Sequence, residues 1–208
     1  MLHATPIVFV VDDDASVRKS LALLIGSAGW QSETFGSARE FLSRGRVTTP
    51  SCLVLDVALP DLSGLDVQKR IAADRRDMPI IFISGCSDVP MTARAMKAGA
   101  AEFLAKPFGD NQLLDAIAQA VERSRAALDQ EARIGELKNR YRSLTCRERE
   151  VMALVNVGLL NKQIAAELGI SEITVKAHRG QVMRKMKADS LPDLVRFAEG
   201  LALANSCV

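Results

Sequence analysis

Short, continuously apolar runs recur along residues 1–120, and segments with helical periodicity separate them. Runs such as LVLD and IIFIS show no polar alternation, as expected of parallel strands that helices cover on both faces. We expect strands at Ile7–Val11, Gln31–Phe35, Cys52–Leu55, Ile80–Ile83 and Glu102–Leu104. We expect helices at Ala15–Ser27, Ala38–Ser43, Gly64–Asp74 and Pro90–Lys97, and from Asn111 onward. This alternation predicts an α/β fold, a doubly wound five-stranded parallel sheet.

The last of these helices has no clear end in the sequence. Leu114, Ile117 and Val121 continue its apolar stripe, which then fades among alternating charges. Arg125–Arg140 is therefore predicted to be a helical, solvent-exposed connector that could form a coiled-coil arm. A flexible linker is the alternative.

Strand signals stop at Tyr141, and four short helices are expected to follow. Thr145 and Glu148 form a T-x-x-E capping box at the start of the first helix. The other expected caps are Asn161 for the second helix, Ser171 for the third and Ser190 with Asp193 for the fourth, and Gly158 and Gly169 stand where helices end. The sequence therefore predicts an α/β domain at 1–124, a helical linker at 125–140 and a second, all-α domain at 141–208.

The composition excludes a disordered polyelectrolyte. Of 208 residues, 48% are hydrophobic and 25% are charged, with a net charge of +2. Bulk charge therefore gives no argument for nucleic-acid binding. The charge is uneven, however, with 12 Lys and Arg against 14 Asp and Glu in residues 1–120, and 10 against 7 in residues 141–208.

The cysteines and the apolar spans bear on the compartment. Cys52, Cys86, Cys146 and Cys207 form no CxxC pair, so they are predicted to be thiols in a reducing cytoplasm rather than zinc ligands. No cleavable signal pattern is present, and no apolar span approaches the ~20 residues of a membrane helix. The chain is expected to be cytoplasmic, with no membrane partner.

Polar side chains stand at the ends of the predicted strands. Asp12 and Asp13 follow the first strand, Asp56 ends LVLD, Ser84 ends IIFIS and Lys106 follows EFLA. The carboxyl ends of parallel strands form one rim, so these five side chains are expected to converge. Neighbouring carboxylates repel one another, and a hard divalent cation, most naturally Mg²⁺, would compensate their charge.

This set of groups suits phosphoryl transfer. Asp56 could act as a nucleophile and form an aspartyl phosphate. Lys106 would supply a second cation and Ser84 a hydrogen-bond donor to the phosphoryl oxygens. Asp14 is expected to begin the following helix instead, because a helix N-terminus favours an anion.

Four motifs at these spacings, VVDDD, LVLDVALPDLSG, FISG and AEFLAKPF, resemble the CheY-like receiver domain of bacterial two-component response regulators over residues 5–124. The resemblance implies that Asp56 is the phosphoacceptor. Asp13 and Asp56, with the backbone carbonyl of Ala58, would hold Mg²⁺, and Asp12 would act through water. Lys106 would contact the phosphoryl group, and its bond to Pro107 would be cis.

The same resemblance implies that Ser84 and Phe103 form a switch pair, in which the hydroxyl moves toward phosphate and the ring turns inward. Taken alone, Phe103 is more consistent with a core residue, and Cys86 with a filler. Two positions depart from the family pattern: Ala58 is smaller than usual beside the phosphoryl site, and Leu59 replaces Met.

The third helix of the second domain has two distinct faces. At about 100° per residue, Val175, Val182 and Met186 point in one direction, toward a core. The opposite face presents Lys176, Ala177, Gly180, Gln181 and Arg184. This positive face, small at its centre, could enter the major groove of DNA, with Lys162 and Arg179 at phosphates. Gly180 costs about 1 kcal/mol relative to Ala inside a helix, which favours a role in close approach.

The motifs LTCREREV, NKQIA and TVKAHR resemble the LuxR-type helix-turn-helix of the NarL/FixJ regulators, over Leu144–Phe197. The resemblance implies that Lys176, Ala177 and Gly180 approach bases and that Ser190–Leu201 supports dimerisation. His178 and Arg184 complete the candidate DNA-binding set, although His178 alone is more consistent with a structural role. A helical protein-docking module is the alternative.

Together these features predict a phosphorylation-controlled transcription regulator rather than an enzyme. A sensor histidine kinase would phosphorylate Asp56, and the face that includes Pro90–Gly99 would then promote homodimerisation or release the DNA-binding helix. Paired domains would read two half-sites of promoter DNA, and RNA polymerase is a further expected partner. The alternatives are a phosphatase that turns over at Asp56, and a constitutive DNA-binding protein whose first domain only docks partners.

Overall fold

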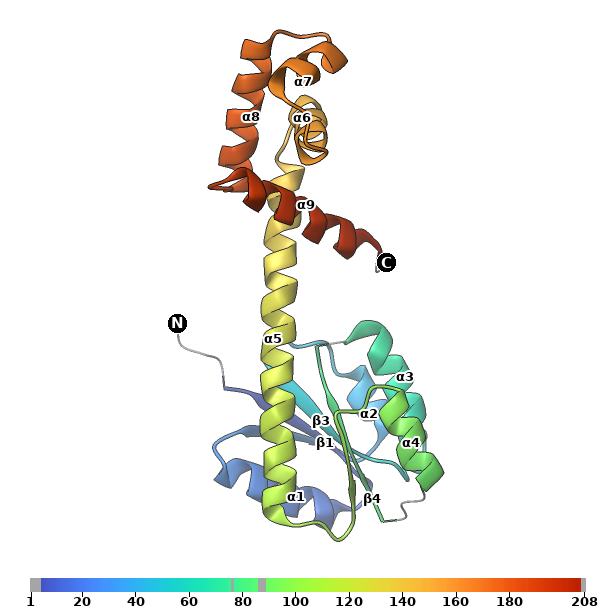
Figure 1. Cartoon of the computed structure of the whole chain (residues 1–208). Helices are drawn as coiled ribbons and strands as arrows, with labels where there is room; N and C mark the ends of the chain where they lie inside the picture. Colours follow the sequence, from blue (N-terminus) through green and yellow to red (C-terminus); the bar gives the residue numbers. More distant parts are fainter. Residues whose placement is uncertain (1–4, 76, 86–88, 207–208) are drawn as a thin grey trace. The chain divides into compact units, whose positions relative to one another are not determined.

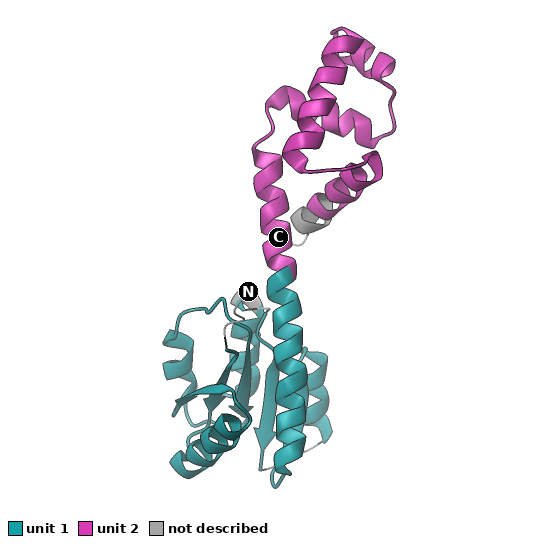
Figure 2. Cartoon of the chain, turned by 90° about the vertical axis from the view of Figure 1, so that its left-hand side faces the viewer, with its two compact units in different colours: residues 1–129 teal, residues 130–208 magenta. Residues whose placement is uncertain are grey.

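The computed structural model describes residues 5–75, 77–85 and 89–206 of the chain. The chain forms two compact units, residues 1–129 and 130–208 (Figure 2). Helix α5 (Asp110–Arg142) contributes to both, and it is helical throughout the range for which a connector was predicted. The predicted domain limits at 124 and 141 stay predictions. Cys86 and Cys207 lie outside the described residues.

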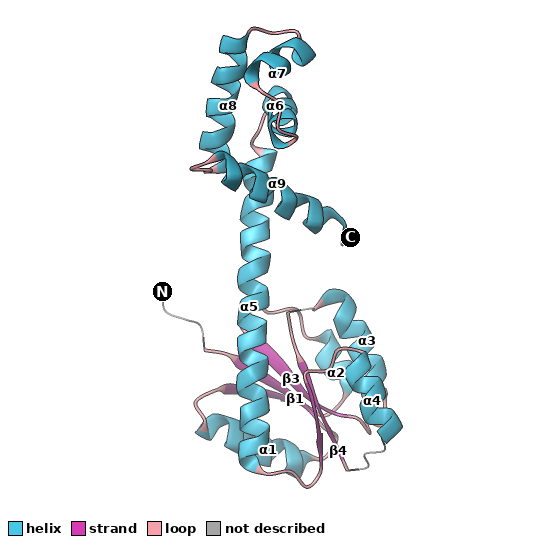
Figure 3. Cartoon of the chain, viewed as in Figure 1, coloured by secondary structure: helices cyan, strands magenta, loops and turns pink. Residues whose placement is uncertain are grey.

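The first unit is built on a five-stranded parallel sheet, which confirms the predicted fold class (Figure 3). Its strands are β1 (Ile7–Val11), β2 (Gln31–Phe35), β3 (Ser51–Asp56), β4 (Ile80–Ser84) and β5 (Glu102–Ala105), in the order β2-β1-β3-β4-β5. Strands β3 and β4 extend beyond their predicted ends to include Asp56 and Ser84. The chain turns to opposite sides of β1 for β2 and β3, so the switch point lies between β1 and β3.

Helices cover both faces of the sheet (Figure 1). Helices α1 (Ala15–Ser27) and α5 pack on one face, and α2 (Ala38–Ser43), α3 (Gly64–Asp74) and α4 (Val89–Lys97) pack on the other. Successive residues of β1 alternate between the two cores, with Phe9 and Val11 facing α2–α4, and Val8 and Val10 facing α1 and α5. Every residue of β3 and β4 is buried, which explains the apolar runs Cys52–Leu55 and Ile80–Ile83 within them.

The second unit comprises the end of α5 with α6 (Cys146–Asn156), α7 (Asn161–Leu168), α8 (Glu172–Met186) and α9 (Leu191–Ser206). Thr145 and Glu148 form the predicted capping box, and Ser171 caps α8. The Ser190 hydroxyl accepts from the Asp193 amide, and the Asp193 carboxylate accepts from the Ser190 amide. These reciprocal bonds confirm the expected cap of α9.

The prediction that Asn161 caps α7 is wrong. Leu160 holds the N-cap position, and its amide donates to Gln163 Oε1 at 2.8 Å. Asn161 is the first helical residue, and its Oδ1 accepts a hydrogen bond of 2.6 Å from Arg179 Nη1 on α8. The leucine side chain has no hydrogen-bond acceptor for the first amides of α7, and the side-chain bond at the helix start comes from Gln163 instead. The Asn161 side chain ties α7 to α8.

The cysteines and the lengths of the helices bear on two further expectations from the sequence. Cys52 is buried, and burial raises the pKa of its thiol to about 12; Cys146 is exposed, and both are free thiols. Within the described ranges, no helix has both the length and the apolar character needed to cross a bilayer.

Gly64 begins α3 at the point where this helix meets the end of β3. A Cβ atom built at this position would lie 3.0 Å from the Asp56 carbonyl oxygen, the Val57 Cα and a ring carbon of Phe82. Two of these three atoms belong to the backbone, which cannot rotate away. The absence of a side chain therefore lets α3 lie close to the strand end that carries Asp56.

We predict that Gly64→Ala lowers the free energy of unfolding of the first unit by about 1–3 kcal/mol, because the new methyl group overpacks the junction. Gly26→Ala is the matched control, since nothing lies within 4 Å of a Cβ at this position inside α1. The control should be neutral or stabilising. Urea unfolding followed by the fluorescence of Trp30, the only tryptophan, measures both. Equal effects of the two substitutions would contradict the close-contact argument.

Candidate functional site

An ammonium group bridges two buried carboxylates at the carboxyl end of the sheet. Lys106 Nζ lies 2.8 Å from Asp12 Oδ2 and 2.7 Å from Asp56 Oδ2. Asp12 directly follows β1, Asp56 ends β3 and Lys106 directly follows β5, so the ends of three strands meet at this point. Asp12 is 1% exposed and Asp56 7% exposed. The structure therefore brings these three predicted site residues together.

Backbone amides orient the remaining carboxylate oxygens. Asp12 Oδ1 accepts from the Asp14 amide at 2.9 Å, and Asp56 Oδ1 accepts from the Ala58 amide at 2.9 Å. Asp14 is the N-cap of α1, as expected, and its carboxylate accepts from the Ser16 amide at 2.7 Å. The local turns after β1 and β3 thus hold Asp12 and Asp56 toward the rim.

Burial and hydrogen bonding shift the pKa values of this site in definite directions. Burial raises the pKa of Asp12 by more than the bonds from Lys106 and the Asp14 amide lower it. Burial alone would lower the pKa of Lys106, but the hydrogen bonds to Asp12 and Asp56 outweigh this and raise it. The ammonium form of Lys106 is therefore favoured, whereas the burial that raises the pKa of Asp12 disfavours its charged form.

The carboxylates fit a divalent cation. One oxygen each of Asp12, Asp13 and Asp56 lies within 4.8 Å of the others. In their charged forms, the three carboxylates and the Lys106 ammonium carry a formal charge of −2, which a single divalent ion would neutralise. Oxygen donors are also the ligands that Mg²⁺ prefers. The carbonyl of Ala58 as a fourth ligand stays a prediction; Ala58 itself is exposed, and Leu59 is buried in the core.

Ser84 and Phe103 lie on neighbouring strands beside this rim. Ser84 is buried at the end of β4, and its carbonyl accepts from the Lys106 amide at 2.8 Å. Phe103 is half-buried on β5, where its ring centroid lies 6.2 Å from that of Phe82. The Lys106–Pro107 bond is cis, as the family resemblance implied. The switch roles of Ser84 and Phe103 stay predictions.

Helix α8 has the two faces expected from its sequence. Val175, Val182 and Met186 are buried in the core of the second unit. The opposite face is exposed along its whole length, and its members are Lys176, Ala177, Gly180, Gln181 and Arg184. Lys162 is exposed in the first turn of α7. The structure therefore presents these residues to solvent, as contact with a ligand would require.

His178 and Arg179 are placed differently from the rest of the candidate set. Both are half-buried on the flanks of α8, and the Arg179 guanidinium donates to Asn161 on α7. The structure thus gives Arg179 a role in holding the two helices together. Its contact with phosphate stays a prediction.

Ile173 is a residue that the sequence reasoning missed. It lies in the first turn of α8 and is 83% exposed. At about 100° per residue it points roughly 180–200° away from Val182 and Val175, in line with Gly180. The helical wheel that predicted the polar face could have included Ile173, but an apolar residue does not fit a pattern defined by polarity.

Family comparisons account for both units. Residues 8–118 match the family described as "Response regulator receiver domain", and residues 142–198 match "Bacterial regulatory proteins, luxR family". The chain is a response regulator. It joins a receiver domain to a LuxR-type DNA-binding domain, so the rim of Asp12, Asp56 and Lys106 lies in the receiver domain and α8 in the DNA-binding domain.

Individual relatives extend the similarity to nearly the full chain. This response regulator is 53% identical over 198 residues to nodulation protein W of Bradyrhizobium diazoefficiens, covering 95% of this chain and 87% of that protein. It is 44% identical to the transcriptional regulatory protein FixJ of Azorhizobium caulinodans, covering 92% and 90% of the two chains. A solved structure of the response regulator StyR is 47% identical, with a TM-score of 0.84, and covers 94% of this chain and 99% of that one.

The raised pKa of Asp12 leads to a prediction about stability. An acid whose folded-state pKa is raised stabilises the fold fully only below its unfolded pKa, and this contribution is lost as pH rises through the folded pKa. The Asp12→Asn variant has no carboxyl group to ionise, so it does not lose this stability as pH rises. We therefore predict that it increases the free energy of unfolding of the receiver domain by about 0.5–2 kcal/mol at neutral pH without metal, and by less toward pH 4.

Urea titrations followed by Trp30 fluorescence, in EDTA and at several pH values, measure this difference. Asp13→Asn is the control, because Asp13 is the exposed carboxylate of the same turn. If Asp12→Asn destabilised the receiver at every pH, the bond from Lys106 to the Asp12 carboxylate would outweigh the cost of its burial, contrary to our interpretation.

Proposed function

We propose that this response regulator is activated when a sensor histidine kinase phosphorylates Asp56. The observation that carries the proposal is the position of the Asp56 carboxylate, buried at the strand ends between the Lys106 ammonium and the Ala58 amide. A carboxylate held in this way is oriented for attack, and the adjacent cation stabilises the charge that develops on the phosphoryl group.

In the proposed reaction, a carboxylate oxygen of Asp56 attacks the phosphorus of a phosphohistidine on the kinase. The new O–P bond forms as the N–P bond breaks, and the imidazole keeps the electron pair and takes up a proton. Lys106 transfers a hydrogen bond from Asp56 to a phosphoryl oxygen. Asp13, Asp56 and the Ala58 carbonyl would hold Mg²⁺, with Asp12 acting through water, and the ion would supply positive charge to the phosphoryl group.

Phosphorylation then shifts the receiver between two states. The Ser84 hydroxyl moves toward the phosphoryl group, and the half-buried ring of Phe103 turns inward from β5. The surface that includes Pro90–Gly99 changes with β5, which promotes homodimerisation or frees the DNA-binding domain. Two domains in a dimer read half-sites about one helical turn apart on promoter DNA, in the cytoplasm and in contact with RNA polymerase.

Intact mass after incubation with Mg²⁺ and acetyl phosphate tests the first step. We expect a single phosphoryl adduct that disappears in EDTA and in Asp56→Asn. Asp66→Asn is the matched control, because it removes an exposed carboxylate of α3 and should leave the adduct unchanged. An adduct that persisted in Asp56→Asn would place the phosphate elsewhere. Repeated turnover with release of phosphate would favour the phosphatase alternative.

The exposed face of α8 supports recognition of DNA by this helix. Lys176 can donate to base edges in the major groove, and Lys162, near the N-terminus of α7, can meet a phosphate. Ile173 lies in the first turn of α8 on the same face, and it can offer an apolar side chain to a thymine methyl group. Specific binding then depends on α8 and general affinity on the flanking lysine.

We predict that Lys176→Ala weakens binding to a selected promoter site by about 1–3 kcal/mol while leaving random DNA nearly unaffected. Lys162→Ala should weaken both and lower the salt dependence by about one phosphate contact. Fluorescence anisotropy at two salt concentrations measures these effects, with Lys19→Ala in the receiver as control. Equal losses on specific and random DNA for Lys176→Ala would contradict base recognition.

A substitution at Gly180 is expected to change the stability of α8 and its affinity for DNA in opposite directions. Inside α8, with nothing within 4 Å of a Cβ at its position, it has no structural reason to be glycine. We predict that Gly180→Ala makes α8 more stable by up to about 1 kcal/mol, measured by hydrogen exchange of its amides. The same variant should bind promoter DNA more weakly, because the methyl group occupies the space that a base edge needs. Unchanged DNA affinity would exclude close approach at this residue.

A further inference from the structure

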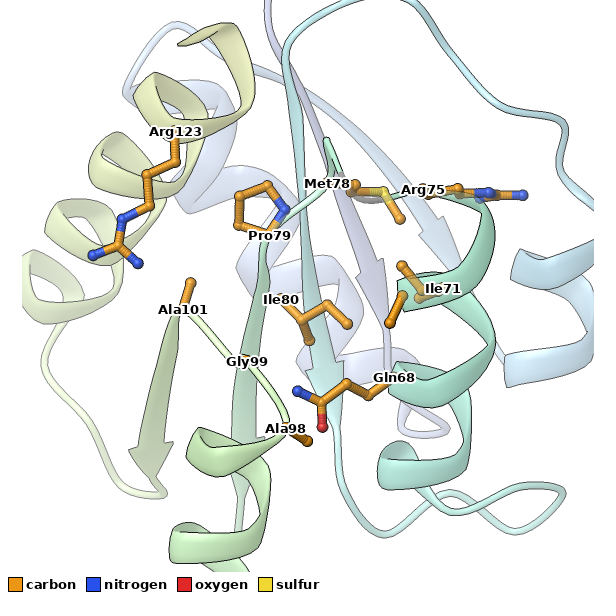
Figure 4. Close-up of a pocket in the computed structure, with 11 residues that line it drawn as sticks. Gln68, Ile71, Arg75, Met78, Pro79, Ile80, Ala98, Gly99, Ala101 and Arg123 are labelled. Atoms are coloured by element: carbon orange, nitrogen blue, oxygen red, sulfur yellow. The ribbon is translucent and has the colours of Figure 1, made fainter. Parts of the chain in front are cut away.

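The receiver domain has a cavity at the opposite end of the strands from Asp56. It has a volume of about 340 Å³ and lies between the end of α3, the start of β4, the α4–β5 connection and α5 (Figure 4). This volume is at the lower end of the roughly 300–1,000 Å³ typical of small-molecule sites. Its apolar lining comprises Ile71, Met78, Pro79, Ile80, Ala98 and Ala101.

The charged side chains that line this cavity are positive. Arg75 and Arg123 line it, and none of the described lining residues carries a carboxylate. The Arg75 guanidinium stacks on the Phe41 ring, 5.2 Å from its centroid. Arg123, on the exposed side of α5, makes no hydrogen bond or ion pair with any described residue. Figure 4 shows its side chain extending from α5 toward Ala101, at the edge of the cavity. An anionic group would therefore meet an available guanidinium there.

A buried amide lines the same cavity. Gln68 is 3% exposed, and its Nε2 donates to the Ala95 carbonyl of α4 at 3.1 Å. This bond fixes the orientation of the amide, because the oxygen cannot face a carbonyl. Gln68 Oε1 is buried and has no hydrogen-bond partner among the described residues. This oxygen has less than 1 Å² of accessible surface, so the Gln68 amide forms part of the cavity wall and its oxygen does not face the contents of the cavity.

We propose that this cavity binds a small organic anion, with an apolar body that fills the cavity and a carboxylate that pairs with Arg123. The α4–β5 connection that lines the cavity includes Ala101, whose amide donates to the Ile80 carbonyl at 2.8 Å. Phe103 follows two residues later on β5. A ligand here contacts the segment that leads into the switch strand, and its binding is therefore linked to the state of the receiver.

Titration of the full-length protein with 4-hydroxybenzoate and 3-(4-hydroxyphenyl)propionate tests the proposal. The corresponding amides serve as neutral probes. The amide NMR signals of Gly99 and Ala101 report binding. We expect a saturable shift with the hydroxy acids, and affinities several-fold weaker for the neutral amides, which lack the negative charge. No saturable shift with either hydroxy acid at millimolar concentration would overturn the proposal.

Variants locate the contacts. Arg123→Gln should lower the affinity for the hydroxy acids about five- to tenfold, to the level of the amides, because it removes a charge-assisted hydrogen bond. Arg133→Gln, at an exposed arginine of the same helix, should leave it unchanged. Ala101→Leu should abolish binding by filling the cavity. Equal effects of the two arginine substitutions, or binding that survives Ala101→Leu, would show that the probes bind elsewhere and would overturn the assignment.

Discussion

The receiver domain depends on one ammonium group shared between two buried carboxylates. Asp12 and Asp56 stand at the ends of adjacent strands, and the Lys106 Nζ lies within 2.8 Å of an oxygen of each. Without this cation, the two buried like charges would repel each other across the switch point of the sheet. The cation also ties the end of β5 to the ends of β1 and β3. One side chain therefore holds together both the charge balance and the geometry of the site.

This arrangement couples the site to the rest of the sheet. The Lys106 side chain bonds Asp56, and its backbone amide bonds the Ser84 carbonyl. A change in the charge at Asp56 thus acts directly on the residue that joins the ends of β4 and β5. Phe103 lies three residues before Lys106 and packs against Phe82 of β4. A local electrostatic change therefore has a short path of bonded and packed groups to the exposed edge of the sheet.

The sequence predicted those features that follow from a regular pattern. Buried parallel strands are apolar on both faces, so β3 and β4 were evident, and the polar residues at their ends marked the rim. Side-chain contacts that do not follow from the order of strands and helices were not predictable. Asn161 looks like a helix cap until Arg179, eighteen positions away, is seen to bind its side chain. The cavity beside Arg123 combines residues from α3, β4 and α5, and no local motif indicates it.

Two glycines show how the same residue type can serve different ends. At Gly64 three atoms would lie only 3.0 Å from a methyl group, so close packing within the fold favours glycine where α3 meets β3. At Gly180 the surroundings are empty, and the fold would be served better by alanine. A residue that costs helix stability on an otherwise open surface indicates a partner that the isolated chain lacks. On α8, between Lys176 and Arg184, the partner that we propose for this face is the edge of a DNA base pair.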